Sequence, residues 1–168
     1  MPLTPFHFGP TGLLGLPFRR HLDLAVFFLA NVVIDVEPLL LLVLPFNWPL
    51  HGFVHSYLIG GIAGGLWGWH AWRLRTYFER FQAFAKIPYQ PNRRRMVVSG
   101  IAGAWTHVFV DSFMHADMRP FWPARGNPLL HLLTNREIYL VCVFCTILLA
   151  LWYLRYFLRY AHKRRRRF

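Results

Sequence analysis

The sequence predicts an all-α protein that crosses a membrane several times. Of its 168 residues, 55% are hydrophobic and 18% aromatic, and the mean hydropathy of +0.31 is high for a soluble domain of this length. The 19 lysines and arginines give a net charge of +12, but they fall in short blocks between long apolar runs. Such blocks are typical of membrane topology, so we expect no nucleic-acid partner.

The N-terminal region predicts a short helical hairpin. Residues 8–18 are too few to span a bilayer alone, and the apolar run at 22–44 is interrupted by two acidic residues and a proline. The expected elements are a helix from about Pro5 to Phe18, a turn at Arg19 and Arg20, and a helix from about Leu22 to Ile34 that Pro38 ends or kinks. We expect no removable signal peptide, because no basic region followed by a long apolar stretch and a cleavage site begins the chain.

Three later apolar runs are long enough for full transmembrane helices, each of which takes about 20 residues. They are Val54 to Trp72, Met96 to about His115, and Ile138 to Phe157. Basic residues gather at Arg19 and Arg20, in the loop 73–95 and after Arg155, and this side should face the cytoplasm. We therefore expect one membrane-embedded domain, residues 1–168, in the inner membrane, with residues 158–168 as a basic cytoplasmic tail.

Histidines and carboxylates sort to the opposite face of the predicted membrane domain. They are Asp35, Glu37, His51, His55, His107, Asp111, His115, Asp117 and His131, joined by His7 if the hairpin forms. His107, Asp111 and His115 recur every four residues, so on a helix each is turned only about 40° from the last. Ionisable groups in a span cost roughly 2.5–3.5 kcal/mol each, which a bound divalent ion would offset. A hydrogen-bond network that packs helices is the alternative.

The remaining donors flank two helix ends on that face. Asp35 and Glu37 close the second hairpin helix, where the helix dipole favours a cation, although a simple turn would also explain them. His55 stands at the outer start of the next span, where Pro49 suits a first helical turn, and a single histidine there is often a capping or interfacial residue. Ser56 would at most hydrogen-bond a ligand.

Nitrogen and oxygen donors predict a catalytic divalent metal, most simply zinc, with manganese or iron as alternatives. Such an ion favours hydrolysis, and Glu37 or Asp117 could act as the general base. Arg119 and Arg125 suit the oxygens of a phosphate, or else anchor the chain at the interface. The two cysteines, Cys142 and Cys145, lie in the last apolar run, where we interpret them as packing residues.

Four short motifs, in order over residues 4–123, resemble the YdjM-like family of inner-membrane metal-dependent hydrolases. They are Thr4-Pro5-Phe6-His7, Ile34-Asp35-Val36-Glu37, Gly52-Phe53-Val54-His55-Ser56, and His107 with Asp111 followed by Trp122-Pro123. Some relatives have the motif Asp-x-Phe-Thr-His, which corresponds here to Asp111-Ser112-Phe113-Met114-His115. The departures are Ile34 for a proline, Val54 and Met114 for threonines, and Leu50-His51 for His-Arg. The resemblance implies His7, Asp35, His55, His107 and Asp111 as metal ligands and leaves His51 in doubt. Its distant similarity to zinc-dependent phospholipases C implies a helical metal site acting on phosphoesters.

These patterns leave three classes of function open. The first is a metal-dependent hydrolase of a lipid or lipid-linked phosphoester at the extracytoplasmic leaflet. The second is an ion or proton transporter, which predicts donors that continue toward the cytoplasmic half, where the sequence has none between His70 and the outer group. The third is a scaffold that uses the basic run 162–167, whose ordinary role is to mark topology and attract anionic lipid.

Overall fold

A computed structural model describes residues 4–44, 51–84 and 89–165 of the protein. The regular secondary structure of these residues is entirely helical. This confirms the all-α prediction. The elements are η1 (Thr4–His7), α1 (Phe8–Gly15), α2 (Leu24–Ile34), α3 (Val36–Val43), η2 (Phe53–His55), α4 (Tyr57–Ala71), η3 (Trp72–Leu74), α5 (Arg75–Phe84), α6 (Arg93–Asp111) and α7 (Asn135–Arg165), where η marks short 3-10 helices. Pro49, Lys86, Arg166 and Arg167 lie outside the described residues.

Helix α2 follows α1 as the hairpin prediction requires, but the chain stays helical beyond the predicted end of α2. The carboxylate of Asp23 caps α2 by accepting a hydrogen bond from the Val26 N–H. The helix then breaks at Asp35 and resumes as α3. Pro38 explains the break, because it has no N–H to bond the carbonyl of Ile34. It therefore interrupts the helix and does not end it.

Within the described residues, two helical stretches are long and apolar enough to cross a membrane: Leu24–Val43, made of α2 and α3, and Asn135–His162 in α7. This differs from the prediction of a short hairpin followed by three full spans. The predicted span Ile138 to Phe157 lies within the second stretch. Helix α4 has only 15 residues, fewer than a bilayer requires, and α6 has 19 but begins with three arginines.

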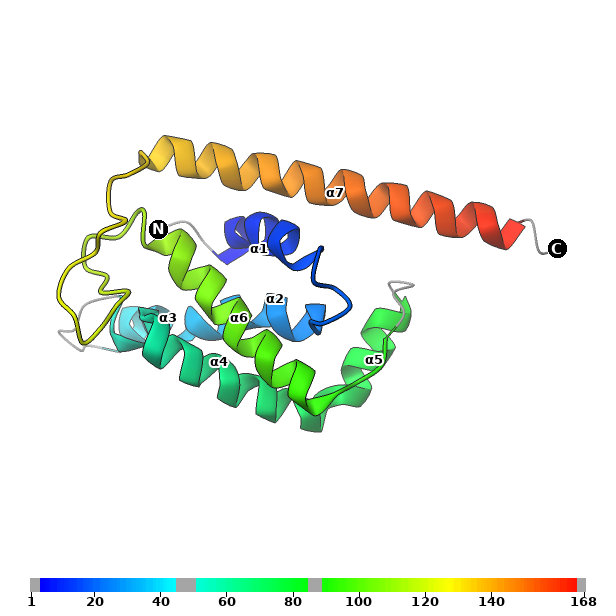
Figure 1. The fold of residues 1–168 in the computed structure, drawn as a ribbon, viewed down its shortest axis with the longest axis horizontal. Helices are drawn as coiled ribbons and strands as arrows, with labels where there is room; N and C mark the ends of the chain where they lie inside the picture. Colours follow the sequence, from blue (N-terminus) through cyan, green and yellow to red (C-terminus); the bar gives the residue numbers. More distant parts are fainter. Residues whose placement is uncertain (1–3, 45–50, 85–88, 166–168) are drawn as a thin grey trace.

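Helix α6 lies at the centre of the fold, packed against α2 and α4, while α1 packs along α7 (Figure 1). The contact between α4 and α6 depends on glycine, since a Cβ atom on Gly64 or on Gly100 would collide with the backbone carbonyl of the other. Gly103 meets the Phe27 carbonyl on α2 in the same way. Small residues thus bring three backbones together and fix the end of α6 near Asp35.

Large apolar side chains point outward from the helices. On α4, Leu58, Ile62 and Leu66 are each more than half exposed and stand four residues apart, which puts them on one face. On α7, Leu140 and Phe144 are about 60% exposed. In water these faces would form large apolar patches, so they need a cover of lipid or protein.

Candidate metal centre

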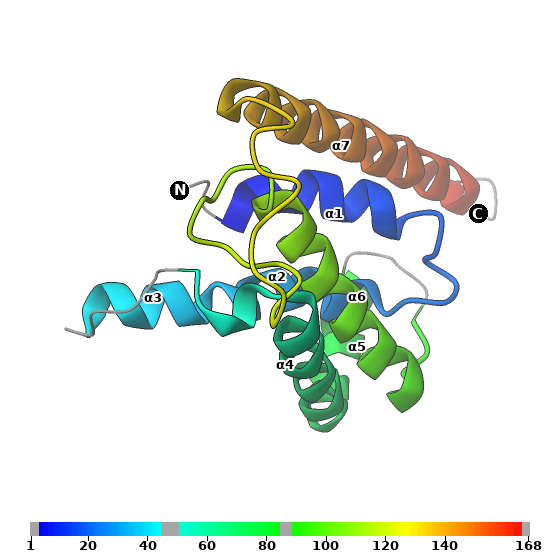
Figure 2. The same cartoon turned by 60° about the vertical axis from the view of Figure 1, so that its left-hand side comes forward.

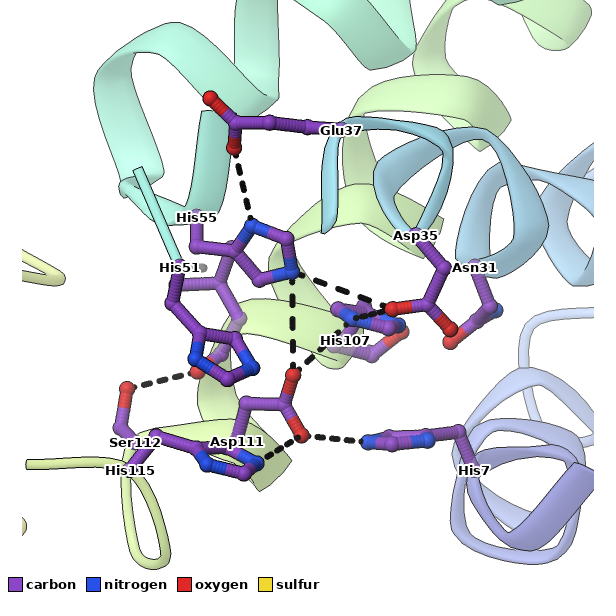
Figure 3. Close-up of polar contacts among 12 residues, drawn as sticks. His7, Asn31, Asp35, Glu37, His51, His55, His107, Asp111, Ser112 and His115 are labelled. Atoms are coloured by element: carbon purple, nitrogen blue, oxygen red, sulfur yellow. Dashed lines mark hydrogen bonds and ion pairs between the residues drawn. The ribbon is translucent and has the colours of Figure 1, made fainter. Parts of the chain in front are cut away.

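Most of the histidines and carboxylates that the sequence predicted on one face lie close together in the fold, and His131 is the exception (Figure 3). Asp35 lies in the break between α2 and α3, and His55 ends η2. His107 and Asp111 occupy the last turns of α6, four residues apart. We call Asp35, His55, His107 and Asp111 the buried cluster.

Donor atoms of the buried cluster converge on one point. His107 Nε2 lies 3.2 Å from Asp35 Oδ1 and 3.1 Å from Asp111 Oδ2. His55 Nε2 lies 3.9 Å from the same two oxygens. Both imidazoles are fully buried and the Asp111 side chain is 3% exposed, whereas Asp35 keeps 26% of its side chain open. The cluster is therefore closed on three sides and accessible beside Asp35.

The donor set fits a divalent ion. In the described chain, neither His55 Nε2 nor His107 Nε2 has a hydrogen-bond partner, although both atoms are buried. Two ligands of a tetrahedral zinc ion stand ~3.3 Å apart when each bond is ~2.0 Å, and the observed separations bracket that value. The four residues form a buried His/Asp group that could hold a metal ion.

Glu37 and His7 contact the ligands from outside the buried cluster. Glu37 Oε2 lies 3.2 Å from His55 Nδ1, on the side of the ring away from the cluster (Figure 3). A carboxylate in this position fixes the tautomer of a liganding histidine. His7 Nε2 lies 2.8 Å from Asp111 Oδ1, and its ring stacks on His107 at 4.5 Å. Asp111 Oδ1 therefore faces His7, while Asp111 Oδ2 faces His55 and His107.

The column of donors predicted along one helix is only partly formed. His107 and Asp111 lie on α6, but the helix ends at Asp111 and His115 lies beyond it. The chain tightens there, since the Phe113 N–H donates to the Val110 carbonyl at 3.4 Å and the Met114 N–H to the Asp111 carbonyl at 3.0 Å, each three residues back. His115 Nε2 still lies 3.8 Å from Asp111 Oδ1. The prediction of a helix to about His115 is therefore wrong in its last turn.

A second group lies beside the buried cluster and contains His51, His115 and Asp117, whose donor atoms could also hold an ion. The rings of His51 and His115 stack at 3.8 Å, and His51 Nδ1 lies 3.0 Å from Asp117 Oδ1. Asp117 also accepts from the His51 backbone N–H at 3.1 Å. Partial burial raises the pKa of Asp117, but the backbone and imidazole of His51 outweigh it and hold the pKa below the usual value.

The segment between α6 and α7 folds back over the start of α4 and so brings Asp117 to His51. The Tyr57 N–H donates to the Pro120 carbonyl at 2.8 Å, and Trp122 packs edge-on against Phe53 at 5.3 Å. In the same segment Arg119 and Arg125 are exposed, and in the described structure neither forms an ion pair with the cluster. His131 is exposed too, with a positive φ of 62°.

Ser56 has a structural partner that the sequence did not indicate. Its hydroxyl donates to the Phe53 carbonyl at 2.7 Å and accepts from the Ile59 N–H at 3.2 Å, so it caps α4. Asn31 was missed altogether: it is fully buried one turn before Asp35 and accepts a hydrogen bond from Thr11 at 3.1 Å. The four-residue spacing between Asn31 on α2 and Asp35 just after it was the signal available.

Comparisons with protein-family models, with curated proteins and with solved structures match nothing to this chain. The motif resemblance therefore stays a prediction.

Proposed function

We propose that this chain is a membrane-embedded, metal-dependent hydrolase that cleaves the phosphoester of a lipid or lipid-linked substrate at the extracytoplasmic leaflet. The observation that carries the proposal is the buried cluster, where two fully buried imidazole nitrogens without hydrogen-bond partners among the described residues face two carboxylates. Each of these two buried nitrogens costs about 1–3 kcal/mol when it has no hydrogen-bond partner. A bound cation would satisfy both nitrogens at once.

The outward apolar faces support a membrane location. A lipid environment accounts for the exposed leucines of α4 and α7 and for the two stretches of spanning length. We place α4 and α6 in the bilayer as well, with the basic loop 73–95 and the C-terminal end in the cytoplasm. The buried cluster then opens on the opposite face.

The ligands we propose are Asp35, His55, His107 and Asp111, with zinc as the favoured ion and manganese or iron as alternatives. When bound, the ion supplies a Lewis acid and eases deprotonation of water near neutral pH. Glu37 holds the proton on His55 Nδ1, so that the Nε2 lone pair points into the cluster. His7 anchors Asp111 through Oδ1 and leaves Oδ2 for the ion.

Proton transfer falls to His51 and Asp117. The Asp117 carboxylate accepts from His51 Nδ1, which leaves Nε2 of this buried ring free to take a proton, as in other carboxylate–histidine pairs. The stacked ring of His115 keeps His51 in place. Arg119 and Arg125, exposed on the same segment, would bind the phosphate oxygens.

A lipid substrate is favoured by an apolar groove beside the cluster. The groove has a volume of about 590 Å³ and runs along α3, between Val36, Leu40 and Leu44 on one side and Phe53 on the other. Glu37 is its one charged lining residue. An acyl or polyprenyl chain in this groove would bring its phosphoester toward Asp35, the open side of the cluster.

The test is turnover of phospholipid and polyprenyl-phosphate substrates by the purified chain, with and without a chelator. Wild type should release product only when metal is present, Asp111→Asn should be inactive, and Glu79→Gln, an exposed carboxylate of α5, should match wild type. Metal or proton flux into proteoliposomes, lost in Asp35→Ala and unaccompanied by hydrolysis, would overturn the proposal in favour of a transporter.

A further inference from the structure

A cavity of about 680 Å³ lies at the other end of the helices, away from the buried cluster. The connection between α1 and α2, the end of α5 and the C-terminal half of α7 surround it (Figures 1 and 2). Trp152 and Tyr156 of α7 form one wall and Tyr89 another. None of the residues assigned above to the metal centre borders this cavity.

The lining of this cavity is strongly basic. Arg19, Arg20 and Arg95 contribute three guanidinium groups, against the single carboxylate of Asp23. That carboxylate already has partners on both oxygens, since Oδ1 accepts from the Val26 N–H at 3.2 Å and Oδ2 from the Tyr89 hydroxyl at 2.6 Å. With three guanidinium groups and one carboxylate in the lining, the net charge facing the cavity is positive.

Two buried donors in the lining lack an acceptor. Gln82 is only 4% exposed, and among the residues that the structure describes none accepts from its Nε2 atom. The same holds for the buried Nε atom of Arg95, whose Nη1 reaches the Arg20 carbonyl at 3.4 Å. Buried donors normally have a partner, and an acceptor-rich ligand in the cavity would supply one to both.

Arg19, in the connection between α1 and α2, and Arg95, on α6, are both oriented by residues distant in the sequence. The Arg19 guanidinium lies over the Trp152 ring, 5.5 Å from its centroid, and Arg95 is tied to the backbone of Arg20. These contacts restrict the two side chains before any ligand arrives. A prearranged pair of guanidinium groups is suited to a tetrahedral oxyanion, whose oxygens accept several charge-assisted hydrogen bonds.

We infer that this cavity is a binding site for a phosphate group, distinct from the proposed hydrolytic centre. The phosphate is carried either by the headgroup of an anionic lipid or by a soluble ion. Gln82 and Arg95 supply the two unpaired donors, and Arg19 and Arg20 supply charge from the rim. Tyr89 keeps Asp23 engaged, so that its carboxylate does not compete for the arginines.

The experiment measures binding of two probes to the full chain in a neutral detergent. Inorganic phosphate is titrated in one arm and phosphatidic acid, presented in the same micelles, in the other. Arg95→Gln should weaken binding about tenfold or more, because a charge-assisted hydrogen bond is worth roughly 1.5–3 kcal/mol. Arg94→Gln is the matched control, since Arg94 directly precedes Arg95 on α6, is exposed and does not line the cavity. Gln82→Leu should also weaken binding without lowering thermal stability.

Binding of either probe that depends on Arg95 and not on Arg94 supports the site, and the probe that binds identifies the source of the phosphate. Equal losses in Arg94→Gln and Arg95→Gln would mean general attraction to a basic surface, and would overturn the inference. So would the absence of saturable binding in both arms, which would leave water as the partner of the two donors. Turnover at the metal centre is not read in this experiment, so its outcome is separate from that of the proposed function.

Discussion

Replacing Glu37 with glutamine tests whether this carboxylate works through His55. Glu37 Oε2 lies 3.2 Å from His55 Nδ1, and the carboxylate keeps 21% of its side chain exposed while the imidazole is fully buried. Loss of such a supporting carboxylate costs roughly 10- to 100-fold in metal affinity, or about 1.4–2.7 kcal/mol. Because solvent screens the exposed part of Glu37, we expect Glu37→Gln to weaken zinc binding about tenfold, near the lower limit.

The assay is a competition titration of the purified chain against a chromophoric zinc chelator. Glu79→Gln, which removes an exposed carboxylate of the same type on α5, should leave the affinity unchanged. Unchanged zinc affinity in Glu37→Gln would refute the positioning role. If turnover is lost at the same time, Glu37 acts as the general base that its sequence position also allowed.

Three further changes test other parts of the account. His51→Ala should keep the bound metal but slow turnover by roughly 100- to 10,000-fold, the usual contribution of a general base; loss of metal instead would make His51 a ligand. Gly100→Ala should lower the stability in detergent by about 1–3 kcal/mol, because its Cβ atom meets the Gly64 carbonyl. Gly65→Ala is the control and should not lower it, since its Cβ atom comes no closer than 3.4 Å to Ile101. Equal unfolding midpoints for the two variants would refute the close packing. With the native cysteines changed to serine, Ala124→Cys should react with an impermeant thiol reagent in spheroplasts and Ala83→Cys only after lysis, and the reverse pattern would invert the topology.

The sequence predicted the class of fold but not the lengths of the helices. Long apolar runs in the sequence show where α4, α6 and α7 lie, whether their apolar residues face outward or inward, because composition does not distinguish the two. The end of α6 was missed because the chain tightens after Asp111 through backbone bonds to carbonyls three residues back, which no hydropathy pattern reports. Pro38 correctly marked a break in the helix, but the four leucines after it, Leu39 to Leu42, did not show whether a helix resumes.

The site was predictable where ligands sit four residues apart on one element, as His107 and Asp111 do. Contacts between distant segments were not predictable, since they depend on how the segment after α6 folds back over the start of α4. The contact of His51 with Asp117 arises from that return, so a motif comparison that weighed each segment alone left His51 in doubt. Asn31, buried beside Asp35, has the same four-residue spacing as the ligands but carries no charge to draw notice.

The metal content of the purified chain tests the central claim most directly. Elemental analysis of wild type should find at least one equivalent of zinc, manganese or iron per chain, and His107→Ala should contain almost none. The variant Glu79→Gln should match wild type. A wild-type protein that holds no metal after exposure to all three ions would contradict the account, because the buried cluster would then be a hydrogen-bonded packing element of the helices.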